Sequence, residues 1–118
     1  MNALKSAAIA AALGLCGAAY SADGSVTISS PAEGAKVGLS AVKIDYDVAP
    51  GPKGDHVHVY VDGEQAGLLH QLKGTYTVDK LTAGKHTLCV RVVDKGHTPV
   101  GLEKCVQVVA GNVPAMGY

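Results

Sequence analysis

The chain contains no tryptophan and no phenylalanine, and only five tyrosines among its 118 residues. A core of large aromatic rings is therefore excluded, and the apolar content comes mainly from valine, alanine and leucine. Valine-rich segments separated by fifteen glycines favour short β-strands joined by tight turns. At this length, the composition predicts one domain of the all-β class.

Neither sign of charge is in excess, because ten lysines and arginines balance ten aspartates and glutamates. No basic stripe points to nucleic acid, and no acidic run points to a disordered tail. The motifs of common enzyme classes are also missing: there is no Gly-x-Ser-x-Gly nucleophile elbow, no phosphate loop and no dinucleotide fingerprint. We therefore expect a binding protein and not an enzyme.

The sequence has no apolar run long enough to span a bilayer of ~30 Å. Its longest apolar run, Ala7–Ala19, follows the positive Lys5 and lies within Met1–Ser21, which we interpret as a secretory signal peptide. The protein is therefore expected in the periplasm or outside the cell, without membrane insertion after signal cleavage. Leu15 precedes Cys16 where a lipid-attachment signal needs a small residue, which argues against lipidation.

We predict a β-sandwich over Ala22–Ala110 and a loose tail over Gly111–Tyr118. Within the sandwich, segments of alternating or β-branched residues bounded by glycine and proline predict strands. These are Ser25–Ser30, Ala35–Leu39, Ala41–Val48, Asp55–Val61, Gln65–His70, Gly74–Val78, Lys85–Asp94 and Gly101–Val109. Seven or so strands at this spacing predict an immunoglobulin-like or fibronectin-like antiparallel β-sandwich.

Two cysteines follow the signal segment, and an even number in an exported protein favours a disulfide. Pairing Cys89 with Cys105 fixes the register of the last two strands. The same register brings opposite charges together and places core residues against core residues. It pairs Arg91 with Glu103, Thr87 with Gln107, Leu88 with Val106, and Val92 with Leu102.

The stretch Asp55–Gly63 (D-H-V-H-V-Y-V-D-G) alternates strictly, so its valines face the core while His56, His58 and Tyr60 face the other side. Two imidazoles two residues apart form a possible chelating pair. In a sandwich of this type the third strand lies beside the sixth, which brings His97 in the following loop close to the pair.

The position of His70 depends on the hairpin turn. A three-residue loop at Asp62–Glu64 would place His70 opposite His56, whereas a two-residue loop would place it opposite Asp55 and on the other face. We predict a metal site, with copper or zinc as the possible cofactor because neutral imidazole suits both. Its candidate ligands are His56, His58, His70 and His97.

Other residues are weaker candidates for a role at this site. Asp55 or Asp94 could orient a ligating ring, and Met116 is a candidate soft ligand. His86 faces the core in the predicted register, where we interpret it as a structural histidine hydrogen-bonded near the turn.

Two other interpretations stay open. The histidines could be ordinary exposed side chains of a non-catalytic module that binds an envelope protein or a polysaccharide through a sheet face or an edge strand. A third interpretation is a small metal-dependent oxidoreductase that uses the same histidines.

Sequence patterns also resemble known families. The segment S-P-A-E-G-A-K-V resembles the opening of many bacterial immunoglobulin-like modules. D-H-V-H-V-Y-V-D-G, L-T-A-G-K-H-T-L and V-D-K-G-H-T-P together resemble small exported bacterial domains of this fold whose function is unassigned. This chain has Asp55 and Ala83 where those domains usually have glycine and proline. The resemblance implies the fold and export, and it brings no chemistry with it.

Overall fold

The computed structural model describes residues 24–111. Eight strands and no helix occupy this part of the chain, which confirms the predicted β-sandwich: β1 (Ser25–Ser30), β2 (Ala35–Val37), β3 (Ser40–Ala49), β4 (His56–Val61), β5 (Glu64–Leu69), β6 (Lys73–Lys80), β7 (Gly84–Val93) and β8 (Pro99–Ala110). The predicted signal peptide lies outside the described residues, as do residues 112–118 of the predicted tail, with Met116.

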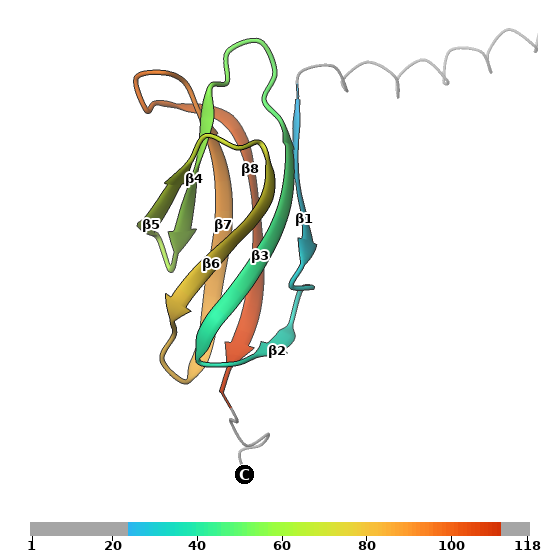
Figure 1. Cartoon of the computed structure of the whole chain (residues 1–118), viewed down its shortest axis with the longest axis vertical. Coiled ribbons are helices and arrows are strands. Elements are labelled where there is room, and N and C mark those ends of the chain that lie inside the picture. Colours follow the sequence, from blue (N-terminus) through green and yellow to red (C-terminus); the bar gives the residue numbers. More distant parts are fainter. Residues whose placement is uncertain (1–23, 112–118) are drawn as a thin grey trace, which may run out of the picture.

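The strands form two sheets packed face to face (Figure 1). One sheet has three strands in the order β1-β3-β6, and the other has five in the order β2-β8-β7-β4-β5. All pairs are antiparallel except β2 with β8. Alternate residues of each strand fill the space between the sheets, as the period of two predicts. The core includes Val42, Ile44, Tyr46, Val48, Val57, Val59, Leu88, Val90, Val92, Val106 and Val108. No helix long and apolar enough to cross a membrane is found within residues 24–111.

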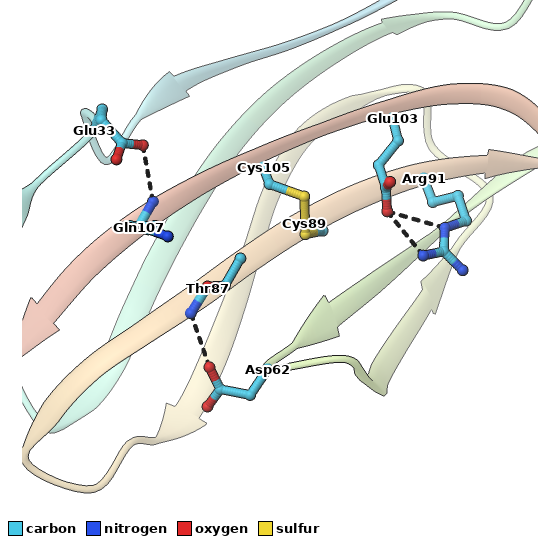
Figure 2. Close-up of a disulfide and its surroundings, with 8 residues drawn as sticks. All are labelled: Glu33, Asp62, Thr87, Cys89, Arg91, Glu103, Cys105 and Gln107. Atoms are coloured by element: carbon cyan, nitrogen blue, oxygen red, sulfur yellow. Dashed lines mark hydrogen bonds and ion pairs between the residues drawn. A yellow bond between two sulfur atoms is a disulfide. The ribbon is translucent and has the colours of Figure 1, made fainter.

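The β7–β8 hairpin has the predicted register over most of its length. Cys89 faces Cys105 and forms the predicted disulfide, and Arg91 pairs with Glu103 through its guanidinium (Figure 2). The predicted pairing of Val92 with Leu102 is wrong, because the register shifts after Arg91.

A tight turn causes that shift. The Asp94 carbonyl accepts the His97 N–H and the Thr98 carbonyl accepts the Asp94 N–H. As a result, Val93 pairs with Pro99, and the surplus residues of β8 are accommodated near Gly101, whose φ is 95°.

The β4–β5 hairpin combines a two-residue turn with a bulge. Asp62 and Gly63 both have positive φ, at 52° and 88°, as in the turn that an Asp-Gly pair favours. Val61 therefore pairs with Glu64, but the register then shifts between Val59 and Tyr60. Ala66 is the extra residue, so the strand beyond it returns to the register that we had assigned to a three-residue loop.

Tyr76 of β6 holds this bulge from the opposite sheet. Its hydroxyl donates to the Ala66 carbonyl over 2.8 Å. A Cβ atom at Gly67 would lie 2.5 Å from the Tyr76 ring, so glycine is needed at this position for close approach. The bulge is therefore built into the packing between the sheets.

His86 has the structural role that the sequence predicted. Its Nδ1 contacts an Asp62 carboxylate oxygen, and its Nε2 lies 2.7 Å from the Thr82 carbonyl. The hydrogen bond to Asp62 raises the pKa of His86, with a further contribution from Thr82 that outweighs burial. Although burial raises the pKa of Asp62, hydrogen bonds from His86 and Thr87 lower it more, so its net shift is downward.

This pair predicts a pH dependence of stability. Because the pKa of His86 is raised on folding, its contribution is present below pH ~6.5 and is lost as the pH rises through the folded-state value. We expect the wild-type protein to lose about 1 kcal/mol relative to His86→Gln between pH 6 and 9, a modest amount because Asp62 is 47% exposed. Urea unfolding of both proteins at several pH values measures this difference; parallel curves would contradict it.

Candidate metal site

The central strand of the site is β4, which lies between β5 and β7. Its valines face the core, and His56 and His58 face the outer side of the sheet. Both histidines are nevertheless buried, with only 2% and 4% of their surface exposed. The interpretation of this pair as exposed surface side chains is therefore wrong. The reason is that histidine rings from other segments cover them. The alternating pattern of β4 shows which face a side chain is on, but it does not show whether another segment covers that face.

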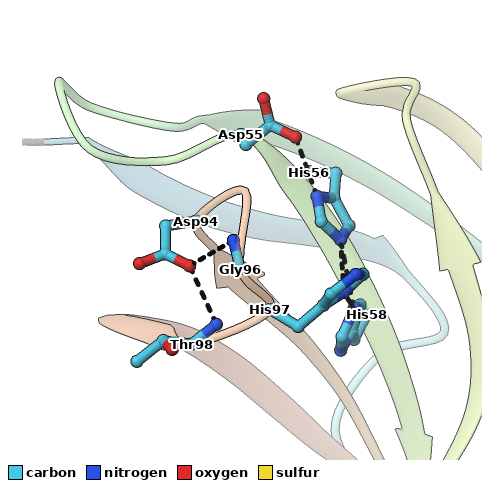
Figure 3. Close-up of polar contacts among 7 residues, drawn as sticks. All are labelled: Asp55, His56, His58, Asp94, Gly96, His97 and Thr98. Carbon is cyan, nitrogen blue, oxygen red and sulfur yellow. Dashed lines mark hydrogen bonds and ion pairs between the residues drawn. The ribbon is translucent and has the colours of Figure 1, made fainter.

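Three imidazole nitrogens meet at this point of the sheet (Figure 3). Nε2 of His56 lies 3.2 Å from Nε2 of His58 and 3.1 Å from Nδ1 of His97. The third side of the triangle, from Nε2 of His58 to Nδ1 of His97, is 3.2 Å. We call these three residues the histidine triad. It brings together three of the four predicted ligands, two from one strand and one from a loop.

The β7–β8 loop presents His97 to the triad. His97 has a φ of 68°, an uncommon conformation for a residue with a side chain. Oδ1 of Asp94 accepts the N–H groups of Gly96 and Thr98, each over 2.9 Å, and so fixes the turn on both sides of His97. Asp94 therefore shapes the loop backbone. It does not orient a histidine ring, which was one of the two alternatives that we had predicted.

Asp55 does orient a ring. Its Oδ2 lies 2.9 Å from Nδ1 of His56. The hydrogen bond from His56 lowers the pKa of Asp55, and nearby positive charges add to this, against a smaller upward effect of burial. Asp55 is thus a carboxylate that only accepts, so Nδ1 of His56 carries the proton and Nε2 presents a lone pair to the triad.

Hydrogen bonding among the rings cannot satisfy this geometry. Because Nε2 of His56 is an acceptor, only His58 and His97 can supply protons to the triangle. If both do, their two N–H groups face each other; if one does, at least one side of the triangle joins two lone pairs. A cation bound by all three nitrogens would satisfy every side at once.

The surroundings of His58 favour its neutral form. Burial lowers the pKa of His58, and the nearby His56, His97 and Arg91 lower it further. Its Nδ1 lies 3.3 Å from the Tyr60 hydroxyl, and the Arg91 guanidinium lies 4.2 Å from the centre of the Tyr60 ring. A neutral imidazole is the form that binds a metal ion.

His70 lies beside the triad but outside it. The bulge at Ala66 places His70 opposite His56, and the two ring centres are 5.1 Å apart. His70 forms a second group with Asp55 and His56, in which one ligand atom from each residue lies within 4.8 Å of the other two. The fourth predicted ligand is therefore close to the triad but belongs to a different group, and His56 is the one residue that the two groups have in common.

The triad has the dimensions of a three-coordinate metal site. A Zn–N bond of ~2.05 Å places an ion about 0.9 Å outside a triangle of this size, and an ideal tetrahedral ion separates its ligands by about 3.3 Å. The observed nitrogens are within about 0.2 Å of that spacing. Three histidines with an open fourth position can bind zinc or copper.

No family model matches the chain, and no curated protein matches it. Solved structures do share its fold. The fibronectin(III)-like modules of CbhA from Clostridium thermocellum are 21% identical with a TM-score of 0.59, over 75% of this chain and 99% of that one. An engineered protein is 23% identical with a TM-score of 0.54, over 75% of this chain and 20% of that one.

A lytic polysaccharide monooxygenase from Jonesia denitrificans is also similar. It is 20% identical with a TM-score of 0.51, over 69% of this chain and 60% of that one. At these identities the likeness concerns the fold alone, and it shows that the chain has a fibronectin III-like sandwich fold. What the histidine triad does has to be argued from its own geometry.

Proposed function

We propose that this protein is an exported module that binds one transition-metal ion, copper or zinc, through the histidine triad. The observation that carries the proposal is the convergence of three ring nitrogens within 3.2 Å of one another, two of them on the buried rings of His56 and His58. Buried polar atoms normally have hydrogen-bond partners, and a set of converging lone pairs is best satisfied by a cation.

The neighbours of the triad support the same proposal. Asp55 holds the far nitrogen of His56, which is the arrangement that fixes a ligating histidine and raises its basicity. The Asp94 turn holds His97 in place before any ion arrives. All three first ligands would be neutral, so a bound divalent ion keeps its charge and has room for a further ligand from solvent.

Export is supported by the disulfide between Cys89 and Cys105, since such bonds persist in oxidising compartments. A periplasmic or secreted metal-binding module would meet copper and zinc outside the reducing cytoplasm.

The proposal is tested by titrating the purified protein with Zn²⁺ and Cu²⁺ in competition with a chelator of known affinity. We expect His97→Ala to weaken binding at least about 100-fold, because losing a ligand costs more than losing a group that merely orients one. His97 is an exposed loop residue, so the variant keeps the sandwich intact.

His86→Gln is the matched control, since it also removes one histidine but from the Asp62 pair. It is expected to bind metal like the wild type. Equal affinity of the wild type and His97→Ala would contradict the proposal, as would the absence of binding by both.

A non-catalytic interaction module is the second candidate function. β5 lies at the edge of the five-stranded sheet, and its Leu68 is 39% exposed directly beside His58 in the strand register. An edge strand can pair with a strand of an envelope protein, and an exposed sheet face can contact a polysaccharide. This function predicts indifference to metal in the same titration.

A further inference from the structure

The ring of His56 takes part in two groups of possible ligands. Its Nε2 belongs to the histidine triad, and its Nδ1 faces the carboxylate of Asp55. Asp55 and His70 complete the second group. The two nitrogens of one imidazole point in opposite directions, so ions bound on the two sides would not compete for the same lone pair.

We propose that Asp55, His56 and His70 form a second metal site, which shares the His56 ring with the triad as a bridging ligand. This inference rests on the proposed metal site at the triad. The second ion takes the place of the proton on Nδ1 of His56, which is released to solvent, and the ring becomes an imidazolate bound to one ion at each nitrogen.

The geometry of the second group suits a more weakly held ion. The Asp55 oxygen and Nδ1 of His56 are 2.9 Å apart, so the Asp55 side chain has to move only about 0.4 Å outward to reach the ~3.3 Å spacing of two ligands on a tetrahedral ion. His70 is more distant, but it is exposed and follows the last residue of β5, so its side chain is free to turn toward the others. Asp55 is 32% exposed, whereas His56 is buried. The second group therefore has two solvent-accessible members, Asp55 and His70, whereas the triad has one, His97.

The carboxylate gives this site a different chemistry from the triad. One anionic oxygen and two nitrogens bind zinc and divalent copper, and the negative charge of Asp55 offsets part of the repulsion between two divalent ions that share a ring. The bulge at Ala66 is what brings His70 into reach, since an unbroken two-residue hairpin would place it on the other face.

The test is a Cu²⁺ titration of the full protein followed by electron paramagnetic resonance, beside His70→Ala. We expect the wild type to bind two ions per chain. The second equivalent should reduce the signal of the first, because an imidazolate bridge couples the two unpaired electrons. His70→Ala should bind one ion and keep its full signal. His86→Gln is again the control with one histidine fewer, and it should behave like the wild type.

The outcomes separate the two proposals. One ion per chain in both the wild type and His70→Ala, lost in His97→Ala, would overturn the second site and leave the triad standing. Two ions whose signals simply add would overturn the bridge. Failure of the wild type to bind any ion would overturn both proposals together.

Discussion

His58→Val is expected to stabilise the metal-free protein and to remove its stabilisation by metal. Without metal, the triad forces lone pairs or N–H groups against one another in a buried position, and such unsatisfied polar groups cost free energy. Valine is close to histidine in size and favours strands. Once His58 is gone, Nδ1–H of His97 can donate to Nε2 of His56 without a third ring to oppose it. We expect a gain of about 1 kcal/mol in the free energy of unfolding.

The metal-bound protein should respond in the opposite sense. An ion present at 100 times its dissociation constant stabilises the native state by about 2.7 kcal/mol. In His58→Val this increment should fall close to zero, because the remaining two nitrogens bind the ion much more weakly. The substitution thus stabilises the apo protein and destabilises the protein in saturating zinc. This reversal distinguishes a ligand from a residue that only packs.

Urea unfolding with and without zinc measures both effects on the same pair of proteins. Thr87→Val on β7 controls for the general benefit of an added valine in a strand, since Thr87 lies away from the triad. If His58→Val destabilised the metal-free protein as strongly as the loss of a well-packed core residue, the triad would be a structural hydrogen-bond cluster and the metal proposal would fail.

Much of this fold could be predicted from the sequence, because strand patterning is local. The alternation in Asp55–Val61 places each side chain on a face of the sheet whatever its partners are. The cysteine pairing then fixed the register of β7 and β8, since Arg91 with Glu103 satisfies the same alignment. Each of these inferences uses only neighbours in sequence or one long-range constraint.

The burial of the triad could not be predicted in the same way. His56 is covered by the ring of His70, which follows β5, and both His56 and His58 are covered by the ring of His97 in the β7–β8 loop. Whether a loop folds over a sheet face depends on its turn geometry. Histidine adopts positive φ more often than most residues with a side chain, but residue type alone does not predict this conformation at His97. The Asp94-x-Gly96-x-Thr98 pattern was the available clue, because aspartate commonly accepts N–H groups two residues on.

The sequence contains a signal for the position of His70 that neither of the two predicted loop lengths took into account. A glycine inside a strand often marks a bulge or a close approach of another element, and Gly67 marks both. A bulge changes the register after the turn, so turn length alone does not decide which residues face each other. The two-residue turn was therefore compatible with His70 on the side of His56.

Removal of the disulfide is expected to cost the protein about 3 kcal/mol of stability, since the bond closes a loop of 16 residues in the unfolded chain. This domain is small and its core holds one tyrosine and no larger ring, so the loss is a large part of a total that is typically 5–15 kcal/mol for a domain. Cys89→Ala/Cys105→Ala should therefore have a clearly lower urea midpoint and a somewhat steeper slope, because the unfolded chain is no longer held compact by the cross-link.

The same variant should retain the affinity of the folded protein for zinc. Arg91 still pairs with Glu103 across β7 and β8 (Figure 2), and the Asp94 turn still holds His97 (Figure 3). The cysteines lie on these two strands before and after the turn, and neither contributes an atom to the triad. Saturating zinc should accordingly restore about 2.7 kcal/mol to the variant at 100 times its dissociation constant, the same increment that we expect for the wild type. If removal of the disulfide also weakened zinc binding, this would show that the cross-link is needed to position His97 and that the loop alone is not sufficient.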